Sequence, residues 1–450
     1  MTDTICALAT APGGALGIIR VSGPNAFDVV SSICHIDCRN VAANTIHYTH
    51  IVNTDGETID EVMVSIFRAP HSYTGEDSVE ISCHGSRYIL NKVLELLAQN
   101  GCRMAAPGEY TQRAYLNGKM DLSQAEAVAD LIASTNRVSH QVAMSQLRGR
   151  FSSELKKLRY QLLQLTSLLE LELDFSDHED LEFADRTALY DLATTIDSRI
   201  QKLADSFELG QALRNGIPVA IIGKTNVGKS TLLNCLLGDE RAIVSDVHGT
   251  TRDTIEDTLD IDGIQFRFID TAGIRHTSDT VEQIGIERTM QKIKEARIIL
   301  WLMDSWPTEE ESKEMSRLTE GKRCICVYTK ADLIDTERFI PFIVPLLLIS
   351  AKTGFGIESL KRNILTEARI AGFTGQEVII TNARHYDALS RAHVSIQRVV
   401  AGLSGDAPLP PDLLAEDLRQ TLDILAEITG GQITPQEALN NIFSHFCIGK

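Results

Sequence analysis

The stretch GKTNVGKS at residues 223–230 contains residue types that bind the phosphates of a nucleotide. It follows the apolar run IPVAIIG and precedes TLLNCLLG, so it lies between a predicted strand and a predicted helix, as a P-loop requires. Gly223 and Gly228 let backbone N–H groups face phosphate oxygens. Lys229 reaches the β- and γ-phosphates, and Ser230 supplies a Mg²⁺ ligand. The stretch therefore predicts a nucleoside triphosphate site.

Two further motifs supply groups for magnesium and the γ-phosphate. HGTTRD at 248–253 offers Thr251 as a ligand of both. DTAG at 270–273 follows the apolar FRFID, which places Asp270 at the end of a strand, where its carboxylate holds the magnesium shell. Together with the P-loop, these motifs indicate hydrolysis of a nucleoside triphosphate.

A third pair of motifs selects the base. TKAD at 329–332 follows the apolar RCICVYT, and Asp332 accepts hydrogen bonds from N1 and N2 of guanine, which adenine cannot donate. SAK at 350–352 completes the base pocket, so the chain is predicted to be a GTPase. The usual motif begins with Asn, whereas Thr329 lacks the two-ended amide that ties the base pocket to the P-loop. Because a hydrogen bond contributes about 1 kcal/mol, we expect several-fold weaker GTP binding with guanine preference kept.

The group that orients the attacking water is not the usual one. Small Ras-like GTPases carry a glutamine directly after DxxG, and this chain has Ile274 there. Arg275 and Glu282 lie in the following segment, although Glu282 is also consistent with an exposed carboxylate at a helix start. Asn226 in the P-loop could ligate a monovalent cation that neutralises charge in the transition state.

In the FCIGK tail, Cys447 is the fourth residue from the end. It could be a prenylation signal, an unstructured end or a thiol delivered to an active site. Lys450 and the lack of a polybasic stretch disfavour prenylation. Thr434, Pro435 and Glu437 predict a capped helix that runs nearly to the tail. The thiol interpretation remains, with a packing cysteine as its alternative.

Periodicity divides the chain into regions that position these motifs. Residues 1–118 show mixed α and β patterns, with strands predicted at TICALAT, ALGIIRVSG, VMVSIFRA and DSVEISC and a helix predicted over 86–100. Residues 119–213 are helical, 214–372 alternate strand and helix, and 373–450 are helical again. The nucleotide module is therefore predicted to be inserted between two halves of a helical domain. Within LKKLRYQLLQLTSLLELEL, leucines share one helix face: Leu155, Leu158, Leu162, Leu165 and Leu169.

Composition narrows the class of protein further. The chain has 450 residues, 43% apolar and 23% charged, which is typical of a globular protein of roughly two to three domains. No signal peptide or membrane span is evident, so we expect a cytoplasmic protein without membrane contact. The net charge of −18 excludes a broad basic surface for nucleic acid. Nine cysteines without paired spacing indicate reduced thiols rather than disulfides. Cys34 and Cys38 lie near His35, and Cys83 is next to His84, but without a CxxC pattern we predict buried or incidental thiols there rather than zinc ligands.

Stretches along essentially the whole chain resemble the MnmE (TrmE) family of bacterial tRNA modification GTPases. They are ATAPGGALGIIRVSG, YTGEDSVEISCHG, APGEYTQRAYLNGKMDLSQAEAVADLI, GTTRD and FCIGK. The first and the last lie outside the G domain, so general similarity among GTPases does not explain them.

This resemblance implies a multidomain α/β fold. Its parts are an α+β, folate-binding-like N-terminal domain that also dimerises, a helical domain, and a Ras-like P-loop G domain inserted in the helical domain. A reduced folate, 5,10-methylene- or 5-formyl-tetrahydrofolate, is implied at four positions: Arg20, Glu80, Lys119 and Lys450. Glu282 matches the catalytic glutamate, and Cys447 is placed beside the one-carbon site.

In the G domain the resemblance implies ligands for GTP and two metals. The Mg²⁺ ligands are Ser230 and Thr251. The K⁺ ligands are Asn226, Ser245, Val247 and Thr250. The GTP contacts are Asn226, Val227, Gly228, Lys229, Ser230, Thr231, Ser245, Asp246, Val247, His248, Gly249, Thr250, Thr251, Asp270, Thr271, Ala272, Gly273, Thr329, Lys330, Ala331, Asp332, Ser350, Ala351 and Lys352.

The implied activity joins GTP hydrolysis to RNA chemistry. A potassium-stimulated homodimer forms a heterotetramer or larger complex with the flavoprotein MnmG (GidA), which carries FAD. Together they add an aminomethyl or carboxymethylaminomethyl group to C5 of the wobble uridine in certain tRNAs. Folate supplies the carbon, and ammonium or glycine supplies the nitrogen.

Two other classes of GTPase compete with this interpretation. A ribosome-assembly GTPase would bind RNA without modifying it, and such relatives often append a KH module with a GxxG loop. The helical region 380–450 lacks that loop. A membrane-remodelling GTPase would need a basic amphipathic helix or a spanning segment, and neither is visible.

Overall fold

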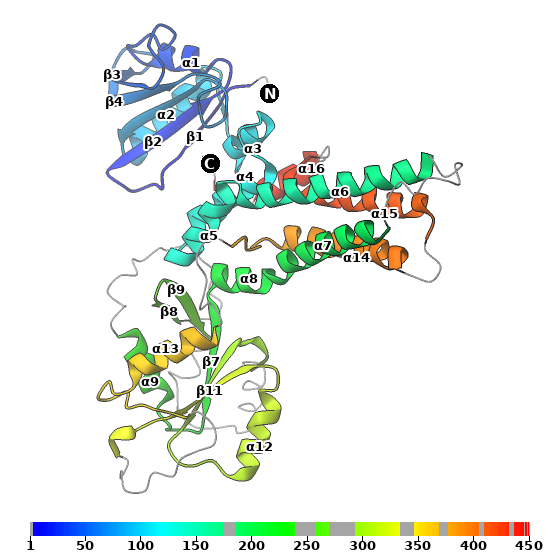
Figure 1. Ribbon diagram of the computed structural model, residues 1–450. Coiled ribbons are helices and arrows are strands. Elements are labelled where there is room, and N and C mark those ends of the chain that lie inside the picture. The colour runs from blue at the N-terminus through cyan, green and yellow to red at the C-terminus, as the bar shows by residue number, and fades with distance from the viewer. Residues whose placement is uncertain are drawn as a thin grey trace. The chain divides into compact units, whose positions relative to one another are not determined.

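The chain forms two compact units (Figure 1). The computed structural model describes residues 3–174, 186–238, 257–269, 293–333, 346–368, 377–404, 409–431, 436–444, 446, 447 and 449. The first unit comprises Met1–Ala133, Ala143–Ala204 and Arg384–Lys450, and the second comprises Ser134–Val142 and Asp205–Ala383. The larger segment of the second unit is therefore inserted in the sequence of the first.

The N-terminal part of the first unit is a six-stranded sheet in the order β3-β4-β5-β2-β1-β6. Its strands are β1 (Ile5–Leu8), β2 (Leu16–Ser22), β3 (Thr45–Val52), β4 (Thr58–Phe67), β5 (Ser78–His84) and β6 (Arg103–Met104). Neighbouring strands are antiparallel except β1 and β6. The apolar stretches predicted as strands are confirmed by β1, β2, β4 and β5.

Two helices cover one face of this sheet (Figure 1). They are α1 (Ala26–Ile33) and α2 (Arg87–Gln99), and α2 confirms the helix predicted over 86–100. Because side chains alternate along a strand, the residues between the buried Ile19, Val21, Val79 and Ile81 point to the other face. Arg20 therefore lies on the face that α1 and α2 leave uncovered.

The rest of the first unit is helical and is assembled from both sides of the insertion. Its helices are α3 (Glu109–Leu116), α4 (Leu122–Ala133), α6 (Arg150–Asp174), α7 (Arg186–Asp205), α14 (Ala383–Ser404), α15 (Pro411–Thr429) and α16 (Gln436–Phe443). Helix α5 (Arg137–Leu147) belongs partly to each unit. Helix α6 runs alongside α15 (Figure 1). The predicted leucine face of α6 is confirmed, because its five leucines are at most 4% exposed.

A buried ionic cluster joins helices from either side of the insertion. The Glu126 carboxylate on α4 accepts hydrogen bonds from Nε and Nη2 of Arg384 at 2.9 and 2.8 Å, and lies 2.6 Å from His385 Nε2. Arg384 also donates to the carbonyls of Glu427 and Ile428 at the end of α15. Burial alone would raise the pKa of Glu126, but His385 and Arg384 together lower that pKa to about 2. An ionised Glu126 therefore holds α4, α14 and α15 together.

The second unit is a six-stranded sheet in the order β12-β11-β10-β7-β9-β8. Its strands are β7 (Ile217–Gly223), β8 (Asp257–Ile261), β9 (Ile264–Phe268), β10 (Ile298–Met303), β11 (Arg323–Tyr328) and β12 (Leu346–Leu348). All pairs are parallel except β8 with β9. Parallel strands bring their carboxyl ends to one edge of the sheet, and the loops after β7 and β11 lie there.

Helices surround this sheet and bury its apolar strands. They are α8 (Phe207–Asn215), α9 (Lys229–Leu237), α12 (Glu309–Leu318), α13 (Ile357–Glu367) and the short 3₁₀ helix η1 (Ala331–Leu333). Helix α8, placed by the sequence in the helical domain, belongs to the second unit because Ala212 and Leu213 pack in its core. Nowhere in the described part of the chain is a helix both long and apolar enough to cross a membrane.

The acid response of the first unit should depend on Glu126. Its folded-state pKa of about 2 lies below the ordinary value of 4.5, so the ionised group contributes stability above pH 4.5 and loses it as the pH falls towards 2. This difference corresponds to about 3 kcal/mol. We expect Glu126→Gln to lower the free energy of unfolding by about 2–3 kcal/mol at neutral pH, measured by urea titration with circular dichroism.

The matched control is Glu427→Gln, which removes an exposed ion pair with Arg391 and should cost under about 1 kcal/mol. The difference between Glu126→Gln and the wild type should vanish near pH 2. Equal losses for both variants at neutral pH would contradict the assignment.

Candidate functional site

The P-loop follows β7 and turns through residues with left-handed backbone. Asn226 has φ +62° and Gly228 has φ +99° immediately before α9. At Gly223, with φ +154°, a Cβ would lie 2.5 Å from the Leu302 carbonyl oxygen. Gly223 therefore permits the close approach of β10, and the positive φ angles wrap the loop around the N-terminus of α9.

The P-loop lysine lies inside this turn. Lys229 Nζ donates to the carbonyls of Gly223 at 2.6 Å and Lys224 at 2.8 Å. Ser230 and Thr231 follow it in the first turn of α9. This places an ammonium group and the helix N-terminus together, which is an arrangement that attracts phosphate.

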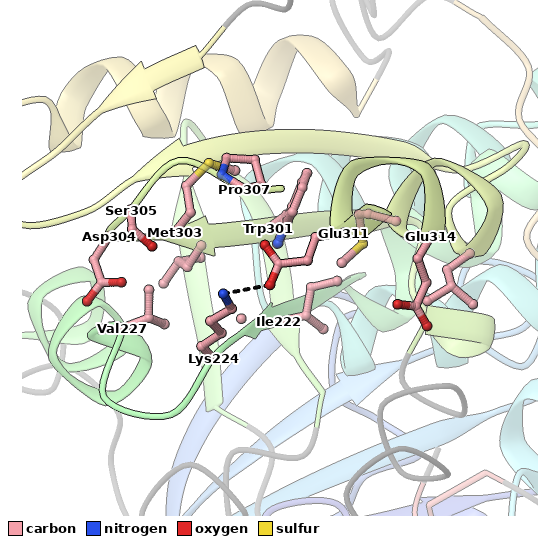
Figure 2. Close-up of a pocket in the computed structure, with 14 residues that line it drawn as sticks. Ile222, Lys224, Val227, Trp301, Met303, Asp304, Ser305, Pro307, Glu311 and Glu314 are labelled. Carbon is pink, nitrogen blue, oxygen red and sulfur yellow. Dashed lines mark ion pairs between the residues drawn. The ribbon is translucent and has the colours of Figure 1, made fainter. Parts of the chain in front are cut away.

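A cavity of about 350 Å³ lies beside the P-loop (Figure 2). The ends of β7 and β10 and helix α12 line it, with apolar surface from Ile222, Val227 and Trp301. The ion pair between Lys224 Nζ and Glu311 Oε1, 2.6 Å long, is drawn as a dashed line in Figure 2. Both partners are partly exposed, so the pair adds little stability and mainly ties the P-loop to the first turn of α12.

The guanine motif is connected to the P-loop, which corrects the expectation drawn from Thr329. Its hydroxyl donates to the Val227 carbonyl at 2.7 Å and lies 3.3 Å from the Met303 carbonyl. Thr329 is only 4% exposed. The tie that we expected to be lost with the asparagine amide is therefore made by the shorter hydroxyl.

The carboxylate of the guanine motif is oriented by the SAK loop. Ser350 Oγ donates to Asp332 Oδ1 at 2.7 Å, and this bond lowers the pKa of Asp332. The amide of Ala331 donates to the Ile349 carbonyl at 2.9 Å, which joins the two loops. Lys330, with φ +57°, forms a 2.7 Å ion pair with Asp304, and Ala351 and Lys352 continue the loop after Ser350. An ionised Asp332 can accept two hydrogen bonds from a base.

The remaining predicted nucleotide residues lie outside the described residues. They are Ser245, Asp246, Val247, His248, Gly249, Thr250, Thr251, Asp270, Thr271, Ala272, Gly273 and Glu282. Of the predicted Mg²⁺ and K⁺ ligands, the structure describes only Ser230 and Asn226.

A second group of polar residues gathers in the first unit around Arg20. Nε and Nη2 of Arg20 donate to Glu80 Oε1 at 2.9 and 2.7 Å across the β2–β5 pair. Nη1 donates to the Gly449 carbonyl at 3.2 Å. The guanidinium carbon lies 5.6 and 5.5 Å from the ring centres of Tyr73 and Tyr110. The structure therefore brings two predicted folate residues and the FCIGK tail together.

The FCIGK tail is docked on the N-terminal part of the first unit. The Cys447 carbonyl accepts from the Gly108 amide at 3.4 Å, and the Cys447 side chain is exposed. Gly449 has φ +94°, and a Cβ there would lie 2.3 Å from the Leu8 carbonyl oxygen. Helix α16 precedes the tail as predicted, although Thr434 and Pro435 lie outside the described residues. The contacts of the described residues Cys447 and Gly449 argue against an unstructured end.

Lys119 reaches this region indirectly. Its Nζ donates to the Pro70 carbonyl at 2.8 Å, in the loop that carries Tyr73. Lys450 lies outside the described residues. Sequence analysis missed Tyr73 and Tyr110, and the signal that could have found them is their position within the YTGEDS and APGEYTQ stretches of the resemblance.

The cysteines near histidine do not indicate a metal site. Among the residues that the structure describes, no group of three or more His, Cys, Asp or Glu side chains could hold a metal ion. Burial raises the pKa values of Cys34 and Cys83 to about 12, so these thiols stay protonated. The prediction of buried thiols at these positions is confirmed.

Comparisons with known proteins cover both units. The description "GTP-binding protein TrmE N-terminus" matches residues 4–119, and "MnmE helical domain" matches 122–447. A protein of Phocaeicola vulgatus named "tRNA modification GTPase MnmE" is 52% identical, and one of Bacteroides thetaiotaomicron with the same name is 53% identical. Each alignment covers 100% of this chain and 99% of the relative.

One solved structure is similar to about a third of this chain. The G domain of the T. maritima FeoB iron transporter is 26% identical and covers 34% of this chain and 98% of its own, with a TM-score of 0.25.

The carboxyl edge of this mostly parallel sheet carries a P-loop, and a hydrogen bond connects the P-loop to the guanine-binding motif. This combination defines a P-loop GTPase. The family models that match this chain and its full-length relatives all point to one family within this class. The chain belongs to the MnmE (TrmE) family of tRNA modification GTPases, and it is a GTP hydrolase.

Removing the Thr329 hydroxyl tests its tie to the P-loop. Thr329→Val keeps the shape but leaves the Val227 carbonyl without this donor, at a cost of about 1 kcal/mol or slightly more. We expect the Kd for a fluorescent GDP analogue to rise about fivefold to tenfold. The control Thr353→Val changes an exposed threonine of the SAK loop and should stay within about twofold. Unchanged binding by Thr329→Val would show that the bond does not support the nucleotide site.

Proposed function

We propose that this chain is a potassium-stimulated GTPase that acts with the flavoprotein MnmG (GidA) on certain tRNAs. The pair adds an aminomethyl or carboxymethylaminomethyl group to C5 of the wobble uridine. The carbon comes from 5,10-methylene- or 5-formyl-tetrahydrofolate, and the nitrogen from ammonium or glycine. The FAD belongs to the partner.

The observation that carries this proposal is the contact between Arg20 and the Gly449 carbonyl. It joins the candidate folate residues Arg20 and Glu80 to the tail that holds Cys447. An exposed thiol two residues before the carbonyl that binds a guanidinium–carboxylate pair suits a one-carbon transfer, because the charged pair can orient a polar ligand and the thiol can form a transient bond. Lys119 and Lys450 would complete the folate contacts.

Cys447 has two chemical roles open to it. Its thiolate could add to C6 of the uridine, which turns C5 into a nucleophile for the one-carbon unit. Loss of the C5 proton and elimination of the thiolate would then restore the ring. Alternatively, the thiol could move a proton to or from the folate adduct.

The second unit would supply GTP hydrolysis. Lys229 would bind the β- and γ-phosphates, Ser230 and Thr251 would hold Mg²⁺, and Asp332 would select guanine. Asn226 lies in the P-loop two residues before Gly228, and it would act as K⁺ ligand together with Ser245, Val247 and Thr250. The cation would take the place of an arginine finger, and Glu282 would orient the attacking water.

The net charge of this chain supports the proposal that the partner flavoprotein makes many of the contacts with tRNA. At −18 the chain has little overall attraction for RNA phosphates. The flavoprotein would therefore make many of the tRNA contacts, with a homodimer of this chain forming the centre of a cytoplasmic complex.

Potassium should accelerate GTP turnover specifically. If K⁺ neutralises transition-state charge, the rate in KCl should exceed the rate in NaCl by about tenfold or more at equal ionic strength. Asn226→Ala should remove the difference between the two salts. Equal rates for the wild type in both salts would contradict the K⁺ assignment.

The variant Glu282→Ala tests whether Glu282 orients the water that attacks GTP. Because Glu282 would act on water rather than on the nucleotide, the variant should bind GTP nearly as the wild type does and hydrolyse it at least about tenfold more slowly. Collapse of GTP binding would instead make Glu282 a structural residue.

The RNA reaction is tested by mass spectrometry of nucleosides from tRNA of cells that lack this gene. Complementation with the wild type should restore the modified wobble uridine, and Cys447→Ser should not. Cys235→Ser, which changes a half-buried thiol of α9, is the control and should restore the modification. GTP turnover should be normal in both variants.

Full modification by Cys447→Ser would leave Cys447 a packing role only. Failure of the wild type to restore any wobble modification, with the flavoprotein present, would favour a ribosome-assembly GTPase.

A further inference from the structure

Tyr73 lies in the loop 68–77 between β4 and β5, and its neighbours fix its position. Thr74 is 1% exposed, and its hydroxyl lies 2.7 Å from the Ser22 hydroxyl. Asn117 Nδ2 donates to the Thr74 carbonyl at 2.8 Å. The backbone next to Tyr73 is therefore held by the sheet and by the end of α3, so the tyrosine ring has little freedom to move.

Two tyrosine rings contact the same guanidinium. The Tyr110 ring is fully buried, and its hydroxyl donates to the Arg20 carbonyl at 2.7 Å. Tyr73 is 39% exposed, and its hydroxyl lies 2.9 Å from Thr111 Oγ1. A cation is attracted to the face of an aromatic ring, most strongly where water is partly excluded. Tyr73 therefore supports Arg20 at the partly exposed side of the cluster.

We propose that Tyr73 is a positioning residue of the one-carbon site that acts through Arg20. Its ring holds the guanidinium in the orientation in which two nitrogens bind Glu80 and the third binds the Gly449 carbonyl. The hydrogen bonds to the Glu80 carboxylate are 2.9 and 2.7 Å long and join two charged groups. The hydrogen bond to the Gly449 carbonyl is 3.2 Å long and has an uncharged acceptor, so it is the weaker one. Without the Tyr73 ring, the guanidinium keeps its hydrogen bonds to Glu80 and first loses its hydrogen bond to the Gly449 carbonyl.

The consequence is that Tyr73 controls where the FCIGK tail docks, and with it the position of Cys447. Burial gives the Tyr73 ring only a modest packing role, since two fifths of the residue is exposed. The tail contact is made between atoms of the chain itself. The effect on folate rests on the proposed function.

The test uses the full-length protein with Tyr73→Leu, which removes the ring, and Tyr73→Phe, which keeps it. Tyr88→Leu, at a 72% exposed tyrosine of α2, is the control. Hydrogen–deuterium exchange of peptides containing Gly108 and Cys447 reports tail docking without ligand. Titration with 5-formyl-tetrahydrofolate reports the site.

For Tyr73→Leu we expect faster exchange of both peptides and a Kd for the folate raised about twofold to fivefold. Tyr73→Phe and Tyr88→Leu should stay within about twofold of the wild type. GTP turnover should not change in any variant, which shows that the chain is folded. Because Tyr73 acts through Arg20, the double variant with Arg20→Lys should exchange no faster than Arg20→Lys alone.

Wild-type exchange in Tyr73→Leu would overturn the proposal, as would additive effects in the double variant. Tyr73→Phe behaving like Tyr73→Leu would assign the effect to the hydroxyl and overturn the role of the ring. A wild type that does not bind the folate overturns the proposed function, while exchange still decides the role of Tyr73.

Discussion

The ion pair between Glu126 and Arg384 holds together helices of the first unit that lie on either side of the inserted segment 205–383. Arg384 is the first residue of the first unit after the insertion. Its planar guanidinium binds a buried carboxylate on α4 and two final carbonyls of α15 at the same time. Removing the Glu126 carboxylate would take from Arg384 and His385 the acidic partner that they share in a largely buried cluster, which costs more than an exposed pair contributes. The point at which the chain returns from the second unit is therefore firmly fixed.

Contacts continue from that point to the FCIGK tail. Helix α15 ends at Gly430, whose carbonyl accepts from the Tyr115 hydroxyl at 3.2 Å, and α16 then packs Leu439 and Phe443 against Leu122. The tail follows and reaches Gly108. A continuous set of contacts gives a route by which strain could travel, but coupling needs two conformations whose populations both sites bias. A change at Arg384 would have to shift α15 and α16 as rigid elements to move the tail.

Local sequence patterns were sufficient for the elements whose periodicity is strong. The leucine face of α6, helix α2 and the strand–loop–helix context of the P-loop follow from spacing alone. Strand β3 was missed because THIV and its neighbours mix polar and apolar residues without an apolar run. The bond from Thr329 to Val227 spans 102 positions, and no local pattern reports such a pairing. Tyr73 was missed for the same reason, since its role depends on Arg20, a distant strand residue.

The two sites also differ in when the growing chain can form them. The P-loop and the guanine motif lie within the inserted segment, so residues 205–383 contain both. The cluster around Arg20 needs Gly449, which is 429 positions away. Closing so long a loop costs entropy that is recovered only when other non-local contacts form as well. The paired helices α6 and α15 and the Glu126 cluster supply such contacts within the first unit, so we expect the tail to dock after these helices have packed together.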